Sequence, residues 1–224
     1  MVNLSTTSEL AKTIWDRFQA VGFTPDFGRK ESRLLIELYR RLAAEGRPIP
    51  AEEVERLAEG AGITSEVAGA FVEMAGERDE EGALRGIVGL SLNRHPHKFL
   101  VQGNELTTWC ALDPMLIAPI MTEAVELESD DPRNGEPIRV SVSPSGVQTY
   151  EPTTAVVSIV IPESGATDNL ETIWKMFCHQ VHFFTSRESG EQFFSGRDIE
   201  VYFLTMEEAF DLGRLTFGPI HAQQ

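Results

Sequence analysis

The sequence predicts an α+β protein, with a winged-helix-like domain of three helices at the N-terminus followed by a mainly antiparallel sheet domain with flanking helices. Two observations support this prediction. Apolar residues recur at helical spacing through the first third of the chain. Short β-branched runs, separated by Gly, Pro and Asn, dominate the rest. We place the boundary so that the domains span residues 1–94 and 95–224.

The composition limits the classes of function. The hydrophobic fraction of 42% allows a substantial core, and no apolar run reaches the roughly 18 residues that cross a bilayer. The formal net charge of −16 opposes binding to nucleic acid, which depends on Lys and Arg, and to anionic membranes. Residues 1–7 lack the basic start and apolar core of a secretory signal. We therefore expect a cytoplasmic protein with no nucleic-acid or membrane partner.

Apolar stripes predict helices in the N-terminal third. Leu34, Leu35, Leu38 and Leu42 form the clearest stripe. In the last of these helices, Val67, Phe71 and Met74 recur at spacings of four and three. The expected helices span residues 8–18, 31–44 and 51–58, and a further helix is capped by Thr64 or Ser65.

The strands that follow resemble the wing of a winged helix. Ile87–Leu92 and Lys98–Val101 are expected to pair as a hairpin, with His95 and His97 as turn residues. This arrangement has two interpretations, DNA binding or a scaffold that packs against the rest of the chain. The preceding helix, Glu66–Met74, contains no Lys or Arg to contact bases and phosphates. We therefore favour the scaffold.

The second half of the chain alternates strands and helices. Residues 170–176 suit either a helix or a strand. Residues 126–135 are expected to form a solvated acidic loop. The expected strands span residues 138–142, 155–161, 199–204 and, if extended, 178–184. The expected helices run from Pro114 to about Val125, from a capping box at Ser189, and from a capping box at Thr205 to near Gly218.

A thiol and a carboxyl lie close together in the stretch Trp109–Pro114. Cys110 and Asp113 precede a proline, which is tolerated only in the first turn of a helix. Backbone N–H groups at a helix start favour negative charge, so we expect the pKa of Cys110 to be lowered. Two alternatives stay open. One is that Asp113 is only a helix N-cap. The other is that Cys110 and the second cysteine, Cys178, are only small buried hydrophobic residues.

Cys178 is the one other cysteine. Two cysteines in such a chain favour reduced thiols over a disulfide framework. Two thiols and a carboxyl suit soft metals such as Hg(II) or Cu(I), or Zn(II) with added ligands, although the spacing is not that of a zinc finger. His179 and His182 are candidate ligands. The alternative for His182 is packing against the phenylalanines that follow it.

Three stretches together carry a resemblance to a known family. They are Trp109–Asp113 followed by a proline-containing apolar helix, then Val142–Ser145, then Cys178–Phe184. In this order and spacing they resemble the organomercurial (alkylmercury) lyase family. The similarity extends through Glu207–Gly213 and covers most of the chain from about Gly86. The helical N-terminal third is similar in kind to that family's winged-helix-like domain.

The resemblance implies which residues act. The family's catalytic cysteines fall on Cys110 and Cys178, its catalytic aspartate on Asp113, and its flanking, substrate-contacting tryptophan on Trp109. It implies cleavage of the carbon–mercury bond of alkyl- and arylmercury compounds by protonolysis, as part of mercuric resistance. The products are a hydrocarbon and Hg(II), which stays on Cys110, Cys178 and Asp113.

The resemblance also implies partners, and two alternative functions remain. It implies no cofactor, turnover by low-molecular-weight thiols, and a mercuric reductase as one candidate acceptor of Hg(II). Two departures from the family are a missing non-catalytic cysteine near Asp131 and His179 in place of a further cysteine. One rival is a soft-metal (mercury or copper) thiolate-binding or sensing protein without lyase activity, although a sensor needs no proton donor such as Asp113. The other is a winged-helix transcription factor, which the acidic charge opposes.

Overall fold

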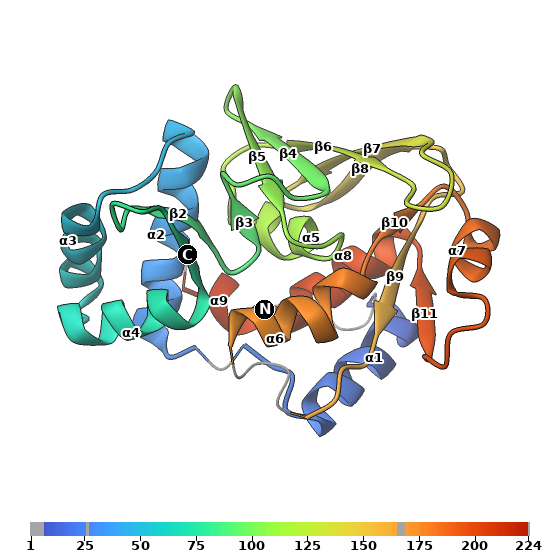
Figure 1. The fold of residues 1–224 in the computed structure, drawn as a ribbon, viewed down its shortest axis with the longest axis horizontal. Coiled ribbons are helices and arrows are strands. Elements are labelled where there is room, and N and C mark those ends of the chain that lie inside the picture. Colours follow the sequence, from blue (N-terminus) through green and yellow to red (C-terminus); the bar gives the residue numbers. More distant parts are fainter. Residues whose placement is uncertain (1–6, 26, 165–168, 224) are drawn as a thin grey trace.

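The computed structural model describes residues 7–25, 27–164 and 169–223. Its main feature is an eight-stranded sheet in the order β1-β2-β3-β5-β4-β6-β7-β8, beside a three-stranded sheet in the order β10-β9-β11. Every strand pair in both sheets is antiparallel. Figure 1 shows α2, α3 and α4 gathered at one end of the molecule and the three-stranded sheet at the other. The α+β class with a mainly antiparallel sheet is confirmed.

The N-terminal helices form close to where the sequence predicts them. Ser8 caps the first by accepting the N–H groups of Leu10 and Ala11. In α4 the buried stripe is Ala68, Phe71, Val72 and Ala75, so Phe71 is the one member of the predicted apolar pattern that is buried: Val67 and Met74 are 45% and 43% exposed. The helices are α1 (Glu9–Ala20), α2 (Arg29–Glu45), α3 (Ala51–Ala61) and α4 (Ser65–Ala75).

The predicted wing pairing is wrong. Residues 87–92 contain a hairpin of their own, in which Val88 and Gly89 form the turn between β2 and β3. Strand β4 pairs instead with β5 and β6, so one sheet continues across residues 94 and 95. The division into two domains stays a prediction. The strands are β1 (Gly76–Arg78), β2 (Leu84–Ile87), β3 (Leu90–Ser91), β4 (His97–Val101) and β5 (Asn104–Thr108).

The helix that begins at Asp113 is much shorter than predicted. Helix α5 (Asp113–Ile117) passes into the short η1 (Ala118–Ile120), because Pro119 has no N–H to continue the helical hydrogen bonds. The first half of the predicted acidic loop is strand β6 (Val125–Asp130), in which Glu126, Glu128 and Asp130 alternate with inward residues. The hairpin β7 (Pro137–Ser143) and β8 (Gly146–Glu151) then completes the large sheet.

The last third of the chain builds the smaller sheet around β9. The ambiguous segment at residue 170 is helix α6. Residues 178–184 are not one extended strand, since η2 occupies their first half. Ser186, not Ser189, caps α7, whereas the predicted capping box at Thr205 is present. The elements are β9 (Val156–Val160), α6 (Leu170–Met176), η2 (Cys178–Gln180), β10 (Phe183–Phe184), α7 (Arg187–Phe194), β11 (Val201–Leu204), α8 (Met206–Thr216) and α9 (Gly218–His221).

Helix α8 lies directly on the short helix α5. A Cβ built on Gly213 would lie 2.5 Å from the carbonyl oxygen of Met115, so only glycine allows this approach. Helix α8 therefore supports the start of α5, where the predicted site lies.

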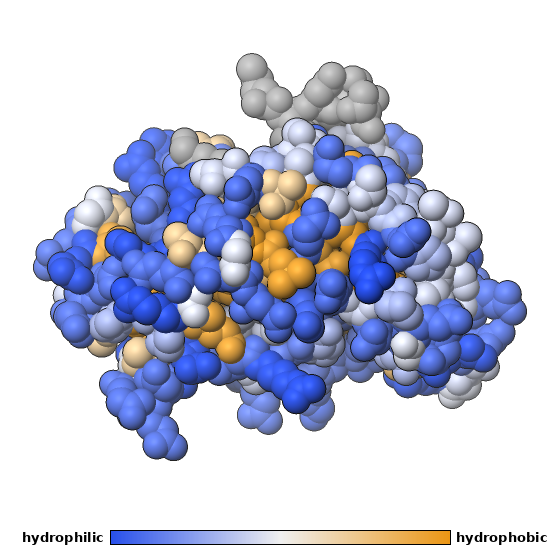
Figure 2. All heavy atoms as spheres, turned by 90° about the horizontal axis from the view of Figure 1, so that it is seen from above, coloured by the Kyte–Doolittle hydropathy of each residue, from blue (hydrophilic) through white to orange (hydrophobic). Residues whose placement is uncertain are grey.

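None of the helices within the described ranges has the length and hydrophobicity needed to span a membrane. The face in Figure 2 is mainly hydrophilic, with hydrophobic residues gathered in a central hollow.

Candidate active site

The loop between β5 and α5 holds Cys110 in a fixed place. Cys110 is fully buried, and Thr108 Oγ1 donates to its carbonyl oxygen at 3.2 Å. Asp113 is the first residue of α5, and its Oδ2 accepts the backbone N–H of Cys110 at 2.7 Å. The N-cap position belongs to Leu112, whose side chain cannot cap. The alternative that Asp113 is only an N-cap is therefore wrong.

Cys178 comes to the same place from a distant part of the chain. It follows α6 at the start of η2 and is 4% exposed. The N–H of Ala111 donates to the carbonyl oxygen of Val181 at 3.1 Å, which joins the two cysteine-bearing segments. The thiols of Cys110 and Cys178 interact by a hydrogen bond, and both cysteines are free. The structure thus brings together the three residues that the sequence singles out.

Burial dominates the electrostatics of this trio. It raises the pKa of Cys110 well above its usual value, and the Cys178 hydrogen bond and the Asp113 charge raise it further. The prediction that a helix start lowers the pKa of Cys110 is therefore wrong, because α5 is one turn long and the site is dry. Burial also raises the pKa of Asp113 to about 6, against the opposing N–H of Cys110.

Cys178 is the less perturbed thiol. The hydrogen bond with Cys110 lowers its pKa, but burial and the Asp113 charge outweigh this, and the pKa is raised overall. Both thiols are therefore protonated at neutral pH, while Asp113 is mostly ionised. The resting site holds two S–H groups beside a carboxylate that can accept a proton.

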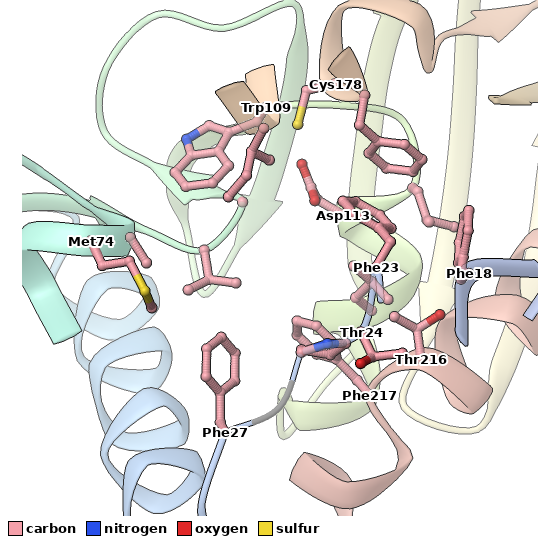
Figure 3. A pocket seen from close by; sticks show the side chains of 18 residues that line it. Phe18, Phe23, Thr24, Phe27, Met74, Trp109, Asp113, Cys178, Thr216 and Phe217 are labelled. Carbon is pink, nitrogen blue, oxygen red and sulfur yellow. The ribbon is translucent and has the colours of Figure 1, made fainter. Parts of the chain in front are cut away.

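An apolar pocket of about 300 Å³ reaches two of these three residues, Cys178 and Asp113. In Figure 3 the sulfur of Cys178 and the carboxyl of Asp113 point toward one another at its wall. Cys110 does not line the pocket and lies behind them. The hydrophobic side chains of the lining are Phe18, Phe23, Pro25, Phe27, Met74, Ala75, Val88, Trp109, Leu112, Leu116, Ile173, Phe177 and Phe217. Small apolar molecules can therefore reach one sulfur and the carboxyl.

The N-terminal segment supplies much of this lining, which the sequence did not reveal. Phe18 and Phe23 contact each other, with ring centroids 5.2 Å apart. Phe23 also lies 4.6 Å from the ring of Phe177, the residue before Cys178. Phe27 packs on Phe71 of α4 at 5.2 Å. The last two contacts join residues far apart in the chain, and only their aromatic character could have indicated them.

Trp109 lines the pocket and is held by a buried carboxylate. Its indole N–H donates to Oε1 of Glu77, which is 8% exposed, and His95 Nε2 lies 3.2 Å from Oε2 of the same side chain. Burial alone would raise the pKa of Glu77, but hydrogen bonds from His95, Asn93 and Trp109 lower it overall. Glu77 and His95 were missed as supports of the site because their partners are distant in sequence.

Two further histidines have structural partners. His182 packs edge-on against Phe184 and Phe193 and faces the carbonyl oxygen of His179 at 3.0 Å. The packing alternative for His182 is therefore confirmed for Phe184, whereas Phe183 packs on His97 instead. His97 is not a turn residue: it is buried in β4, with Nδ1 2.7 Å from Ser129 Oγ. In the described part of the chain, no group of three or more His, Cys, Asp or Glu side chains is arranged to hold a metal ion.

The fold and the site define a protein in which paired thiols and a carboxyl close one end of an apolar pocket. A profile of the alkylmercury lyase family matches residues 90–218. The alkylmercury lyase of Staphylococcus epidermidis is 33% identical over 215 residues, which cover 96% of this chain and 91% of that enzyme. The chain therefore belongs to the alkylmercury lyase family, and the resemblance seen in the sequence is confirmed.

Two further similarities differ in extent. The alkylmercury lyase of Bacillus cereus is 41% identical over 142 residues, and this match spans 62% of the chain but only 61% of that enzyme. A crystal structure titled as the mercury-bound form of MerB2 has a TM-score of 0.69, covering 94% of this chain and 98% of that one at 20% identity. At this identity the structural similarity concerns the fold.

Proposed function

We propose that this protein is an organomercurial lyase that cleaves the carbon–mercury bond of alkyl- and arylmercury compounds by protonolysis. The observation that carries the proposal is the meeting of Cys178 and Asp113 at the wall of an apolar pocket, with the Cys110 thiol directly behind. The pocket suits the organic group, the sulfurs suit mercury, and the carboxyl suits proton transfer to carbon. Trp109 forms part of the wall against which the substrate lies.

The first step is capture of mercury by Cys178. The substrate reaches the protein as an R–Hg thiolate. Cys178 is the thiol that lines the pocket, and its pKa is raised less strongly than that of Cys110. Its sulfur displaces the incoming thiolate, which leaves with the Cys178 proton as a free thiol. The product of this step is R–Hg bound to Cys178.

The second step moves one proton from Cys110 to carbon. Asp113, ionised at neutral pH, takes the proton of the Cys110 thiol, and the freed thiolate bonds to mercury. Two sulfurs on mercury weaken the bond to carbon. The electron pair of that bond then takes the proton from Asp113, and R–H leaves. Hg(II) stays on Cys110 and Cys178, with Asp113 beside it.

The cycle closes by thiol exchange. Two low-molecular-weight thiols bond to Hg(II) and return their protons to Cys110 and Cys178, so the reaction needs external thiols and no cofactor. A mercuric reductase is a suitable acceptor for the released Hg(II). We propose this role in mercury detoxification for a cytoplasmic protein that acts without nucleic acid or membrane.

One assay tests the proposal. The protein is incubated with phenylmercury or methylmercury and excess thiol, and benzene or methane is measured. The expected result is catalytic release of one hydrocarbon per mercury. The alternative is a soft-metal thiolate-binding or sensing protein without lyase activity. It predicts one tightly bound mercury per chain with no hydrocarbon, and the buried proton acceptor Asp113 argues against it.

A further inference from the structure

The turn between β2 and β3 has an unusual backbone. Val88 and Gly89 both have positive φ, +38° and +94°, as a two-residue hairpin turn of this kind requires. Asn-Gly or Asp-Gly normally occupies such a turn, because a β-branched residue is disfavoured in the left-handed region. A strained residue at the wall of the pocket persists only where its surroundings hold it in place.

Three hydrogen bonds from other elements hold this turn. The hydroxyl of Tyr39, fully buried in α2, donates to the carbonyl oxygen of Val88 at 2.5 Å. The N–H of Val88 donates to the carbonyl oxygen of Ala75 at 3.0 Å. The N–H of Trp109 donates to the carbonyl oxygen of Gly89 at 3.1 Å. Tyr39 is the one side chain among these donors, and it comes from about fifty residues before the turn.

The Val88–Gly89 turn lies directly against Asp113, the proposed proton carrier. A Cβ built on Gly89 would lie 2.6 Å from Cγ and 2.7 Å from Oδ1 of Asp113. Gly89 therefore lies against the Oδ1 side of the carboxyl, while Oδ2 accepts the N–H of Cys110. The turn limits the rotation of this side chain and contributes to its burial, which leaves Asp113 7% exposed.

We propose that Tyr39 is a positioning residue for the lyase reaction: by holding the Val88–Gly89 turn against Asp113, it fixes the carboxyl between the Cys110 thiol and the reacting carbon. The inference rests on the proposed function. Burial and the charge of Asp113 raise the pKa of Tyr39 well above its usual value, so its hydroxyl stays a donor. The titratable groups that act on Asp113 or on which it acts are Cys110, Cys178, Tyr39 and His95.

The test is Tyr39→Phe, which removes only the hydroxyl. Benzene release from phenylmercury is expected to fall tenfold to a hundredfold, since small misplacements of reacting groups have effects of this size. Stoichiometric capture of phenylmercury is expected to be unchanged. The acid limb of the pH profile for turnover is expected to move to lower pH, because water admitted beside Asp113 lowers its pKa. Tyr202→Phe is the control, since that hydroxyl contacts Arg17 and Glu200 at the surface.

A second pair of variants tests the turn itself. Gly89→Ala places a methyl group against Asp113 and is expected to abolish benzene release while leaving mercury capture. Gly103→Ala is a matched control. Gly103 is the second residue of the β4–β5 hairpin turn, at φ +79° after Gln102 at +53°, and no atom lies within 4 Å of its Cβ position. Gly103 has a similar left-handed backbone without the contact, so the activity of Gly103→Ala is expected to match that of the wild-type protein.

Failure of the inference and failure of the proposed function give different results. Wild-type protein that releases no hydrocarbon overturns the proposed function. Carbon-13 NMR titration of the Asp113 carboxyl then still tests the inference, which predicts a lower pKa for Asp113 in Tyr39→Phe. The inference is overturned if Tyr39→Phe leaves that titration and, in an active enzyme, the benzene release unchanged. Equal losses of capture and release would also overturn it, because they indicate a merely structural role.

Discussion

At the scale of a single residue, replacing Asp113 is expected to separate mercury binding from chemistry. Asp113→Asn keeps the size of the side chain but cannot carry a proton, so hydrocarbon release is expected to fall roughly a hundredfold to ten-thousandfold, the usual range for general acid–base catalysis. Mercury capture should persist, because affinity for mercury resides in sulfur. Bound mercury and released benzene are measured on the same sample. Full activity of the Asn variant would remove Asp113 from the mechanism.

The two thiols are expected to fail at different steps. Cys178→Ser should lose capture and release together, since Cys178 is the sulfur at the pocket wall. Cys110→Ser should still capture R–Hg but release no hydrocarbon, because the second thiolate and its proton are missing. Folding should survive, since the change in volume is small. Mass spectrometry of the intact protein detects the trapped R–Hg adduct, and near-normal turnover of either variant would refute the two-thiolate mechanism.

The trio was predictable because its local signals are strong. Cys110 and Asp113 are neighbours in sequence, and Cys178 was the one thiol left to join them. Their pKa values were not predictable, because these depend on the depth of burial. Tyr39 escaped notice for a related reason. Its role depends on a contact with Val88, and no spacing rule connects the two residues.

At the scale of elements, Asp131 joins the two sheets. Its buried Oδ2 accepts the N–H and Oγ1 of Thr185, both at 2.9 Å, and Ser189 Oγ at 2.7 Å. Asp131→Ala is expected to cost about 2–4 kcal/mol of unfolding free energy, because several buried donors lose a charged acceptor. The exposed neighbour Asp130 is the control: Asp130→Ala should change stability by less than about 0.5 kcal/mol. Urea unfolding measures both, and equal effects would contradict the assignment.

Elements with clear periodicity were predicted well, and acidic or proline-rich ones were not. Helix α2 and strand β9 formed where their patterns indicated. Strand β6 was mistaken for a loop because its acidic residues suggested solvent, although they alternate with buried Val125 and Leu127. The predicted wing pairing was wrong because tertiary contacts decide which strands pair. The hydrophobic pattern of β4 fits several neighbours equally well.

At the scale of the whole molecule, buried histidines make stability depend on pH. Burial lowers the pKa of His97 to about 3, so between the unfolded value of about 6.5 and pH 3 the unfolded chain binds the extra proton. Stability is therefore lost as the pH falls through this window. Burial also lowers the pKa of His182 and His221. Asp113, raised to about 6, acts in the opposite sense below pH 6, but the His97 shift is the larger.

We therefore expect the urea midpoint to fall between pH 7 and pH 5. His97→Asn keeps a polar atom near the position of Nδ1, which contacts Ser129, but cannot take up a proton. In this variant the fall should be clearly smaller than in wild type. Identical pH profiles for wild type and His97→Asn would contradict the assignment.

The position of Cys110 behind the pocket wall also determines how the protein resists damage. An alkylating reagent that enters the cavity meets the sulfur of Cys178, whereas Cys110 does not line the pocket. Inactivation should then follow the modification of a single thiol per chain, with Cys178 as the residue modified. In the proposed mechanism, Cys110 keeps its proton until mercury has bound to Cys178.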